Sequence, residues 1–277
     1  MSEDGSTVFT VGKDCALKIF SMEEKRQLRS LNLSELALSC VRISRDAKVA
    51  LIGSWDNNIY TYSVEYGRAV DSLTAHDDAV ASIDLSEQHL ISGSWDSTVK
   101  LWQRRPTGIH KVPMIDFVDN ETEVKTVCLS ADGLLGASGA MDGSIHVFDV
   151  RQRRAVQHFQ AHTECVNQVF FSSDSKRILS CSDDGTVRSS QLSGSQLASL
   201  DVASAVWAFA SDGVGNMLLG GTESGKLFTA DFSQGHELMS ISLPAGIRSV
   251  TCSPDASLIV SGGSDAFLRI FSSSSKT

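Results

Sequence analysis

The sequence predicts an all-β protein in which seven small antiparallel sheets, each of four strands, stand around a common axis as a β-propeller. Three observations lead to this prediction. First, a turn motif that ends in aspartate recurs along the whole chain, with Ser224 in the aspartate position of one weaker copy: Asp14, Asp56, Asp96, Asp142, Asp184 and Asp265. Second, successive copies lie 42, 40, 46, 42, 40 and 41 residues apart. Third, short runs of alternating apolar and polar residues fill each period, and a period of about 40 to 45 residues matches one four-stranded blade.

The third repeat shows the expected strands in chain order. An outer strand, "RAVDSLTAH" (68–76), comes before "AVASIDLS" (79–86), "HLISGSW" (89–95) and "STVKLWQ" (97–103). The longest interruption, 103–124, contains Pro106 and Pro113 and accounts for the 46-residue spacing. We interpret it as a stiff loop that is suited to partner contact.

Strand counting at the two ends predicts an incomplete ring. The first copy opens at "STVFTVG" (6–12), which is a second strand, and the last copy ends at "FLRIFSSSSKT" (267–277), which is a third strand. The opening "MSEDG" resembles the turn after an innermost strand. We therefore expect the ring to lack one or two strands at its N-terminal closure, where residues upstream of Met1 would supply them. Open sheet edges would make the isolated chain prone to associate.

Composition restricts the function classes. The 277 residues carry a net charge of −9, which disfavours nucleic acid as the main partner. Neither an apolar run of about 18 residues nor a signal-peptide pattern is present, so we expect a cytoplasmic protein without direct membrane insertion. The 6 cysteines are scattered and form no CxxC pair, which excludes a zinc site or a disulfide framework. We expect one domain over 1–277 and no metal or cofactor.

A polar set in the third repeat suggests how the blade is held together. His76, Ser92, Asp96 and Trp102 stand at the spacing of the WD-repeat signature, and the chain resembles that family. The resemblance implies a hydrogen-bonded structural tetrad. The fifth repeat keeps part of it, with Ser190 in the Trp position: His162, Ser180 and Asp184. A catalytic Ser/His/Asp triad is the alternative, but partial recurrence in other repeats favours structural pins. Since no phosphate loop or HExxH motif is present either, we do not expect an enzyme.

A longer stretch resembles one group of propellers more closely. Residues 53–103, including "GSWDNNIYTY" and "LISGSWDSTVKLWQ", are similar to the C-terminal propeller of BEACH-domain proteins such as the factor associated with neutral sphingomyelinase activation. The resemblance implies a non-catalytic adaptor in membrane traffic or receptor-proximal signalling. It also implies a BEACH domain in the same full-length chain.

The residue before each repeated aspartate predicts where partners bind. In WD-repeat propellers this position lies in a turn on the top face, and here it holds Trp55, Trp95 and Met141 in successive repeats. Neighbouring top-face positions add Lys125, Trp207 and Arg248. Exposed aromatic anchors dominate many protein interfaces, so we predict protein binding at this face. The alternative is that each tryptophan lies flat over its own turn.

A second candidate lies on the opposite face. The stretch Phe148-Asp149-Val150-Arg151 resembles the WDxR box through which some propellers dock onto the adaptor of a cullin-type ubiquitin ligase, with Asp149 and Arg151 as the docking residues. Phe148 replaces the tryptophan of that box. The alternative function is therefore a substrate receptor of such a ligase.

Overall fold

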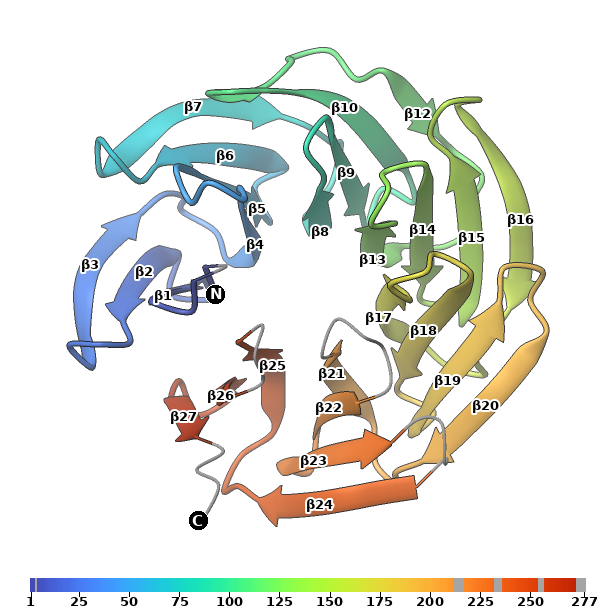
Figure 1. Cartoon of the computed structure of the whole chain (residues 1–277). Helices are drawn as coiled ribbons and strands as arrows, with labels where there is room; N and C mark the ends of the chain where they lie inside the picture. The colour runs from blue at the N-terminus through green and yellow to red at the C-terminus, as the bar shows by residue number, and fades with distance from the viewer. Residues whose placement is uncertain (3, 212–216, 232–235, 254–256, 273–277) are drawn as a thin grey trace.

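The architecture is a ring of small sheets. The computed structural model describes residues 1–2, 4–211, 217–231, 236–253 and 257–272. Every regular element in these residues is a strand, and the strands form seven antiparallel sheets in sequence order. Figure 1 shows the sheets arranged around an axis, with the first and the seventh as neighbours in the ring. The predicted seven-bladed, all-β fold is confirmed. None of the described segments forms a helix that could cross a membrane.

Five sheets contain at least four strands, and four of these follow the simple order of innermost to outermost strand. The second sheet holds β4 (Leu38–Ile43), β5 (Val49–Ser54), β6 (Asn58–Ser63) and β7 (Arg68–Thr74). The fourth holds β13 (Val124–Leu129), β14 (Leu135–Ala140), β15 (Ser144–Asp149) and β16 (Arg154–Gln160). The fifth holds β17 (Val166–Phe171), β18 (Arg177–Ser182), β19 (Thr186–Gln191) and β20 (Gln196–Asp201). The sixth holds β21 (Val206–Ser211), β22 (Met217–Thr222), β23 (Lys226–Asp231) and β24 (His236–Ser242).

The third sheet takes up two short segments of the stretch that we interpreted as a stiff loop. Its first strands are β8 (Val80–Leu85), β9 (His89–Ser94) and β10 (Val99–Arg105). The end of β10 pairs with β11 (Gly108–Ile109), and its start pairs with β12 (Ile115–Phe117), which takes the outermost place. The loop interpretation of residues 103–124 is therefore wrong for these two segments, because pairing with β10 makes them strands.

The first and seventh sheets have three strands each within the described residues. They are β1 (Thr7–Thr10), β2 (Ala16–Ser21) and β3 (Arg26–Asn32), and then β25 (Ile247–Cys252), β26 (Leu258–Gly263) and β27 (Leu268–Ser272). By comparison with the complete sheets, the described residues supply no innermost strand to the first sheet and no outermost strand to the seventh. The predicted strand count at the ring closure is confirmed for this part of the chain.

The turn before β1 is the turn that joins innermost and second strands in other sheets. Ser2 Oγ donates to Asp4 Oδ1 at 2.6 Å, and Ser44 and Ser130 make the same bond, also at 2.6 Å, to Asp46 and Asp132. Such a serine also accepts a backbone N–H and so closes the turn, as Ser44 Oγ does from Val49. The described residues 2 and 4–7 thus make the turn contacts that the sequence predicts for "MSEDG".

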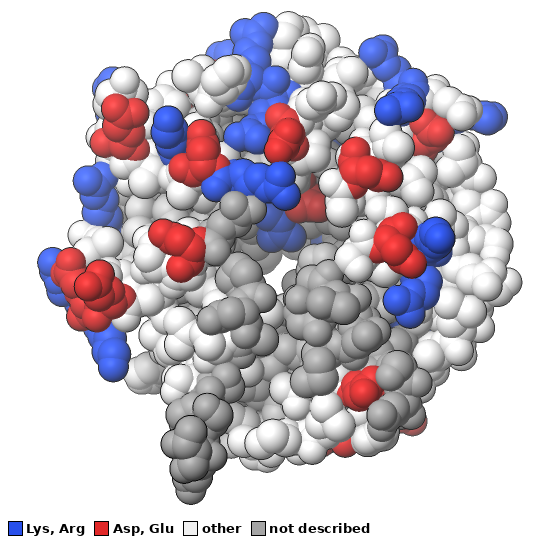
Figure 2. All heavy atoms as spheres, viewed as in Figure 1, with Lys and Arg blue, Asp and Glu red and all other residues white. Residues whose placement is uncertain are grey.

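These turns, together with the turns from third to outermost strands, make up the bottom rim of the ring. Charges of both signs meet there. Arg45 Nη1 lies 3.0 Å from Glu87 Oε1, and the nearby charge of Arg151 contributes, after hydrogen bonds from Ser130 and the Leu134 backbone, to the lowered pKa of Asp132. Figure 2 shows acidic and basic side chains interleaved around the ring. A mixed surface of this kind is a solvated face rather than a single-sign binding patch.

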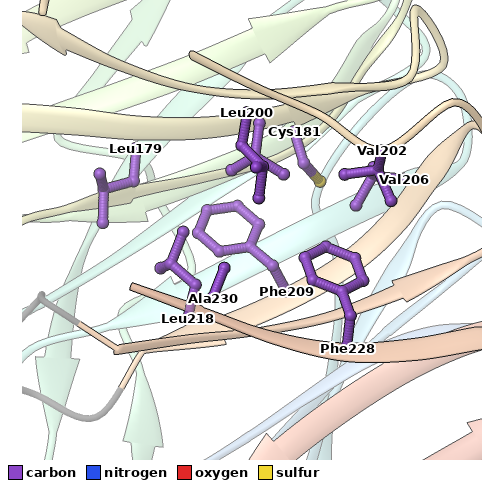
Figure 3. Close-up of a cluster of buried hydrophobic side chains, with 10 residues drawn as sticks. Leu179, Cys181, Leu200, Val202, Val206, Phe209, Leu218, Phe228 and Ala230 are labelled. Carbon is purple, nitrogen blue, oxygen red and sulfur yellow. The ribbon is translucent and has the colours of Figure 1, made fainter. Parts of the chain in front are cut away.

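The hydrophobic core is divided into clusters, several of which lie between adjacent sheets. The cluster in Figure 3 joins the fifth sheet to the sixth, where Leu179 and Cys181 meet Phe209 and Phe228. Glycine in the repeated "GSWD" allows this close approach. A Cβ atom on Gly93 would lie 2.6 Å from Val124 Cγ1 and Val127 Cγ1 of the next sheet. The glycine of the repeat therefore serves packing between blades.

Candidate functional site

The structure brings together the four polar residues that the WD-repeat signature singles out in the third blade. His76 Nδ1 lies 2.9 Å from Asp96 Oδ2, and His76 Nε2 lies 2.8 Å from Ser92 Oγ. Trp102 Nε1 donates to the same Ser92 Oγ at 2.8 Å. The chain of bonds runs from the third strand, β10, through β9 to the loop that leads into β8.

Burial decides what this set can do chemically. Its Asp–His–Ser order is that of a hydrolytic triad, but Ser92 has no exposed surface and His76 only 2%. Trp102 already donates to the hydroxyl oxygen that would have to attack a substrate. Burial disfavours ionisation of Asp96, yet hydrogen bonds from His76 and Thr98 outweigh it and hold the pKa of Asp96 well below its usual range. The geometry is that of a satisfied internal network.

The fifth blade repeats the network with one partner fewer. His162 Nδ1 lies 2.9 Å from Asp184 Oδ2, and His162 Nε2 lies 2.8 Å from Ser180 Oγ. Ser190 is buried at the position of Trp102 and is too short to extend the chain of bonds. Burial lowers the pKa of His162 despite the attraction of Asp184. This histidine is therefore neutral at neutral pH.

The second blade contains a smaller network that sequence reasoning missed. Ser34 stands where the tetrad histidine would be, and its Oγ donates to Asp56 Oδ2 at 2.6 Å. Tyr60 OH donates to the same carboxylate oxygen at 2.5 Å, and Ser54 Oγ donates to Ser34 Oγ at 3.0 Å. The available signal was a hydroxyl side chain four residues after the repeated aspartate.

The residues that precede the repeated aspartates share one place on the top rim, which consists of the turns between second and third strands and the loops between sheets. The backbone N–H of Trp55 donates to Ala37 O, that of Trp95 to Ala79 O and that of Met141 to Glu123 O. The same bond recurs at Asp183, Glu223 and Ser264. Equivalent backbone bonds place these side chains at equivalent points around the ring.

The two tryptophans contact each other across the second and third blades. Their ring centroids are 5.2 Å apart with planes tilted by 46°, and Lys125 Nζ lies 5.3 Å from the centroid of Trp95. Trp55 is 36% exposed and Met141 is 46% exposed. We expected both indoles to point into solvent. This is wrong for Trp95, which is half-buried because Trp55 and Lys125 pack against it. Its Nε1 is buried without a hydrogen-bond partner in the described structure.

The remaining top-face candidates form a separate contact on the sixth and seventh blades. The Arg248 guanidinium lies 3.6 Å from the centroid of Trp207, and that ring also lies close to Gly246. Arg248 is exposed and Trp207 is half-buried. The top-face candidates therefore fall into two groups: Trp55, Trp95, Lys125 and Met141, which we call the tryptophan patch, and the Trp207–Arg248 pair.

Most of the stretch that resembles an adaptor-docking box is buried or hydrogen-bonded within the fold. Phe148 has no exposed surface and packs against Phe117 with ring centroids 4.4 Å apart, while Val150 is 4% exposed. Asp149 Oδ1 accepts a bond from the Gln152 backbone at 2.7 Å within the turn. Arg151 alone of the four is exposed. No group of three or more His, Cys, Asp or Glu side chains suited to a metal ion is found in the described part of the chain.

Known proteins resemble parts of this chain. It is 29% identical over 184 residues to Autophagy-related protein 16 of Arabidopsis thaliana, which is 65% of this chain and 35% of that protein. It is 29% identical over 103 residues to the Periodic tryptophan protein 2 homolog of Caenorhabditis elegans, covering 36% of this chain and 11% of that protein. The chain is 28% identical over 155 residues to WD repeat-containing protein 37 of Xenopus laevis, which covers 55% of this chain and 31% of that protein. The matches thus span little more than a third of these relatives at most.

Family models cover most of the chain. The model described as "Nucleolar protein 10-like, N-terminal domain" matches residues 37–229, which is more than two thirds of the sequence. The model described as "WD domain, G-beta repeat" matches residues 234–272. Together with the seven sheets and the buried tetrad, these matches show that the chain belongs to the WD-repeat β-propellers of the Nucleolar protein 10-like N-terminal domain family.

Proposed function

We propose that this propeller is a non-catalytic protein-interaction module that binds a partner protein through the tryptophan patch. The contact between Trp55 and Trp95 is the observation that carries the proposal. Two adjacent blades present indoles at the same point of the rim, and Met141 extends the apolar surface onto the next blade. A rigid scaffold beneath the patch keeps the entropy cost of binding low, since the tetrad of the third blade holds the turn that carries Trp95.

The chemistry of the patch suits a protein partner. Tryptophan buries a large apolar area and retains one polar N–H group, which is why it is enriched among the residues that dominate interfaces. Lys125 adds a positive charge beside Trp95. We therefore expect the partner to present an apolar side chain that is flanked by an acidic or carbonyl group.

The more specific functional predictions, namely the cellular role, the location and the ubiquitin-ligase alternative, have fewer observations in their support. The BEACH-type resemblance depends on residues 53–103, and a role in membrane traffic or signalling at a cytoplasmic location stays a prediction. The name of the Arabidopsis relative connects that protein with autophagy, and a shared role would be a further prediction for this chain. Docking onto a ubiquitin-ligase adaptor has only the exposed Arg151 in its favour.

The proposed surface can be tested by affinity capture and quantitative mass spectrometry with the full chain as bait. The Trp55→Ala/Trp95→Ala variant should lose specific partners by about tenfold or more, since interface tryptophans commonly contribute more than about 2 kcal/mol. Tyr66→Ala is the matched control, because Tyr66 is a 68% exposed aromatic residue outside the top rim.

Thermal unfolding of the same proteins separates binding from folding. We expect the double variant to keep a melting temperature close to that of the wild-type protein, because Trp55 and Trp95 lie on the rim outside the apolar clusters. Partners that survive the double substitution unchanged would contradict the proposal. So would partner loss that simply follows a loss of fold.

A further inference from the structure

The fourth blade is the place where the repeated aspartate has the fewest partners. Asn120 replaces the tetrad histidine, and its Oδ1 accepts from Ser138 Oγ at 3.0 Å instead of contacting Asp142. Ala140 replaces the serine that binds the aspartate backbone in neighbouring blades, as Ser94 Oγ does for Asp96 N at 3.1 Å. Asp142 Oδ1 accepts the Ser144 N–H at 2.9 Å. No histidine or arginine contacts this carboxylate in the described structure.

The residue four positions after the aspartate differs as well. In the first, second and seventh blades this residue contacts the aspartate: Lys18 pairs with Asp14, Tyr60 donates to Asp56, and Arg269 pairs with Asp265. In the fourth blade the position holds His146, for which no hydrogen bond is found among the described residues. His146 is only 6% exposed, and its ring nitrogens keep some accessible surface but have no hydrogen-bond partner among the described residues.

These departures meet in one groove. A groove of about 570 Å³ lies at the outer edge of the fourth blade, between the 118–123 segment and β16. His146 lines it from β15 and His158 from β16, with ring centroids 4.5 Å apart and planes tilted by 40°. Its ten described lining residues include three carboxylates and neither lysine nor arginine: Asp119, Glu121 and Asp142.

The electrostatics of the groove favour a cation. Burial and the neighbouring His158 lower the pKa of His146, against the pull of Asp119, Asp142 and Glu121, so its imidazole is neutral at neutral pH and offers an acceptor nitrogen. A neutral ring beside three carboxylates leaves a net negative site. The aspartate of the repeat, which a histidine contacts in the third and fifth blades, here receives hydrogen bonds from Ser144 and lines the groove.

We propose that this groove binds an arginine side chain of a partner protein, with the carboxylates facing the guanidinium and the paired imidazole rings beneath it. Guanidinium is planar, presents several donors in fixed directions and stacks on flat rings, whereas an ammonium group is a compact and strongly hydrated charge. A groove with carboxylates around two flat rings therefore suits arginine better than lysine. The site lies on the fourth blade and on the segment that leads into it, and it does not include the indoles of the tryptophan patch.

Histidine-selective NMR on the full chain tests this proposal. The probe is N-acetyl-arginine amide, with the lysine and norleucine analogues as comparisons. We expect the His146 ring resonance to move in a saturable manner with the arginine compound, less with the lysine compound and not with norleucine. The Asp119→Asn/Glu121→Gln variant should weaken arginine binding by about tenfold, since it removes two of the three carboxylate charges that would face the guanidinium.

Two control variants show whether the NMR response is specific to the groove. Glu23→Gln/Glu24→Gln removes the same number of charges from a turn of the first blade and should leave binding unchanged. Trp55→Ala/Trp95→Ala should also bind the arginine compound normally, which separates this site from the proposed function. A His146 resonance that does not respond to arginine, or that responds to Zn²⁺ alone, would overturn the proposal. Equal binding by the Asp119→Asn/Glu121→Gln variant would overturn it too.

Discussion

Ser92 is the residue on which the hydrogen bonds of the third blade converge. Its hydroxyl group contacts both the His76 ring and the Trp102 indole, and its side chain has no exposed surface. Removing it would leave two buried ring nitrogens without a partner. An unpartnered buried polar group costs about 1 to 3 kcal/mol, which makes this serine more important than its size suggests.

We therefore predict that Ser92→Ala lowers the free energy of unfolding by about 2 to 4 kcal/mol, as measured by urea denaturation. Ser180→Ala is the matched control in the fifth blade, where Ser190 replaces the tryptophan and only the histidine ring loses its partner. The control should lose about half as much. Equal losses in the two variants would show that the Trp102 bond contributes nothing.

The buried histidines predict how stability depends on pH. The pKa of His162 is lowered from an ordinary 6.5, so below about pH 6.5 the unfolded chain binds a proton that the folded chain does not. Stability should then fall as pH decreases, by up to about 1.4 kcal/mol per pH unit for each such group. The pKa values of Asp96 and Asp184 are also lowered, but carboxylates that ionise near pH 4 or below do not titrate in this window.

Urea denaturation at pH 7.5 and pH 5.5 tests this dependence. We expect the wild-type protein to be less stable at pH 5.5, and we expect His162→Gln to show a smaller difference between the two pH values, because it no longer has the group that titrates. His146 has a lowered pKa as well, so part of the dependence should remain. An unchanged pH difference in His162→Gln would contradict the assignment.

At the scale of the element, the turn between second and third strands has one constant feature. The residue after the repeated aspartate has a positive φ in every blade, from 61° to 88°. The positions are Cys15, Asn57, Ser97, Gly143, Gly185, Gly225 and Ala266. A residue with a side chain pays roughly 1 to 2 kcal/mol for this conformation, yet four of the seven blades tolerate one. Whether a turn accepts a side chain at this position therefore depends on the space around it.

Gly143 and Gly185 test whether the surrounding space sets the cost of a side chain at this position. A Cβ atom on Gly143 (φ +88°) would lie 2.3 Å from the carbonyl oxygen of His162, whereas on Gly185 (φ +79°) its nearest neighbour would be Ser204 N at 3.4 Å. Both alanine variants carry the conformational cost of about 1 to 2 kcal/mol, and Gly143→Ala adds a backbone clash. Thermal unfolding should show a clearly larger loss for Gly143→Ala. Similar losses would mean that the loop around His162 moves aside easily.

At the scale of the whole molecule, stability comes from packing between sheets, because a single four-stranded sheet cannot cover both of its own faces. Phe209 of β21 is 1% exposed and meets Phe170 of β17 edge to face, with ring centroids 4.9 Å apart. It lies in the cluster that joins the fifth and sixth sheets (Figure 3). This contact therefore packs the fifth sheet of the ring against the sixth.

We predict that Phe209→Ala lowers the free energy of unfolding by about 3 to 5 kcal/mol, the usual result of opening a cavity in place of a buried aromatic ring. Leu197→Ala serves as the control, since Leu197 lies on the outermost strand β20 and is 49% exposed. The Leu197→Ala variant should lose only about 0.5 kcal/mol of its free energy of unfolding. Urea denaturation distinguishes the two, and a loss below about 1 kcal/mol for Phe209→Ala would mean that adjacent blades are only weakly coupled.

The sequence predicted the ring well because its anchors are local. The aspartate turns and their spacing are visible without any tertiary information, and the tetrad follows from the WD-repeat resemblance. The β11 and β12 strands were missed because they are only two and three residues long and show little alternation. The Ser34–Asp56–Tyr60 network was missed because its residues are not those of the signature.

The number of blades follows from the spacing of the repeated turns, which is a local property, and the resemblance to WD-repeat propellers predicts the rim on which Trp55, Trp95 and Met141 lie. The depth at which each side chain lies becomes visible only in the folded chain. Trp95 is half-buried because Trp55 and Lys125 come from other turns and loops to cover it. His146 packs against the His158 ring, which the pairing of β15 with β16 brings beside it. Burial and partnership depend on contacts between segments, and a local pattern does not contain them.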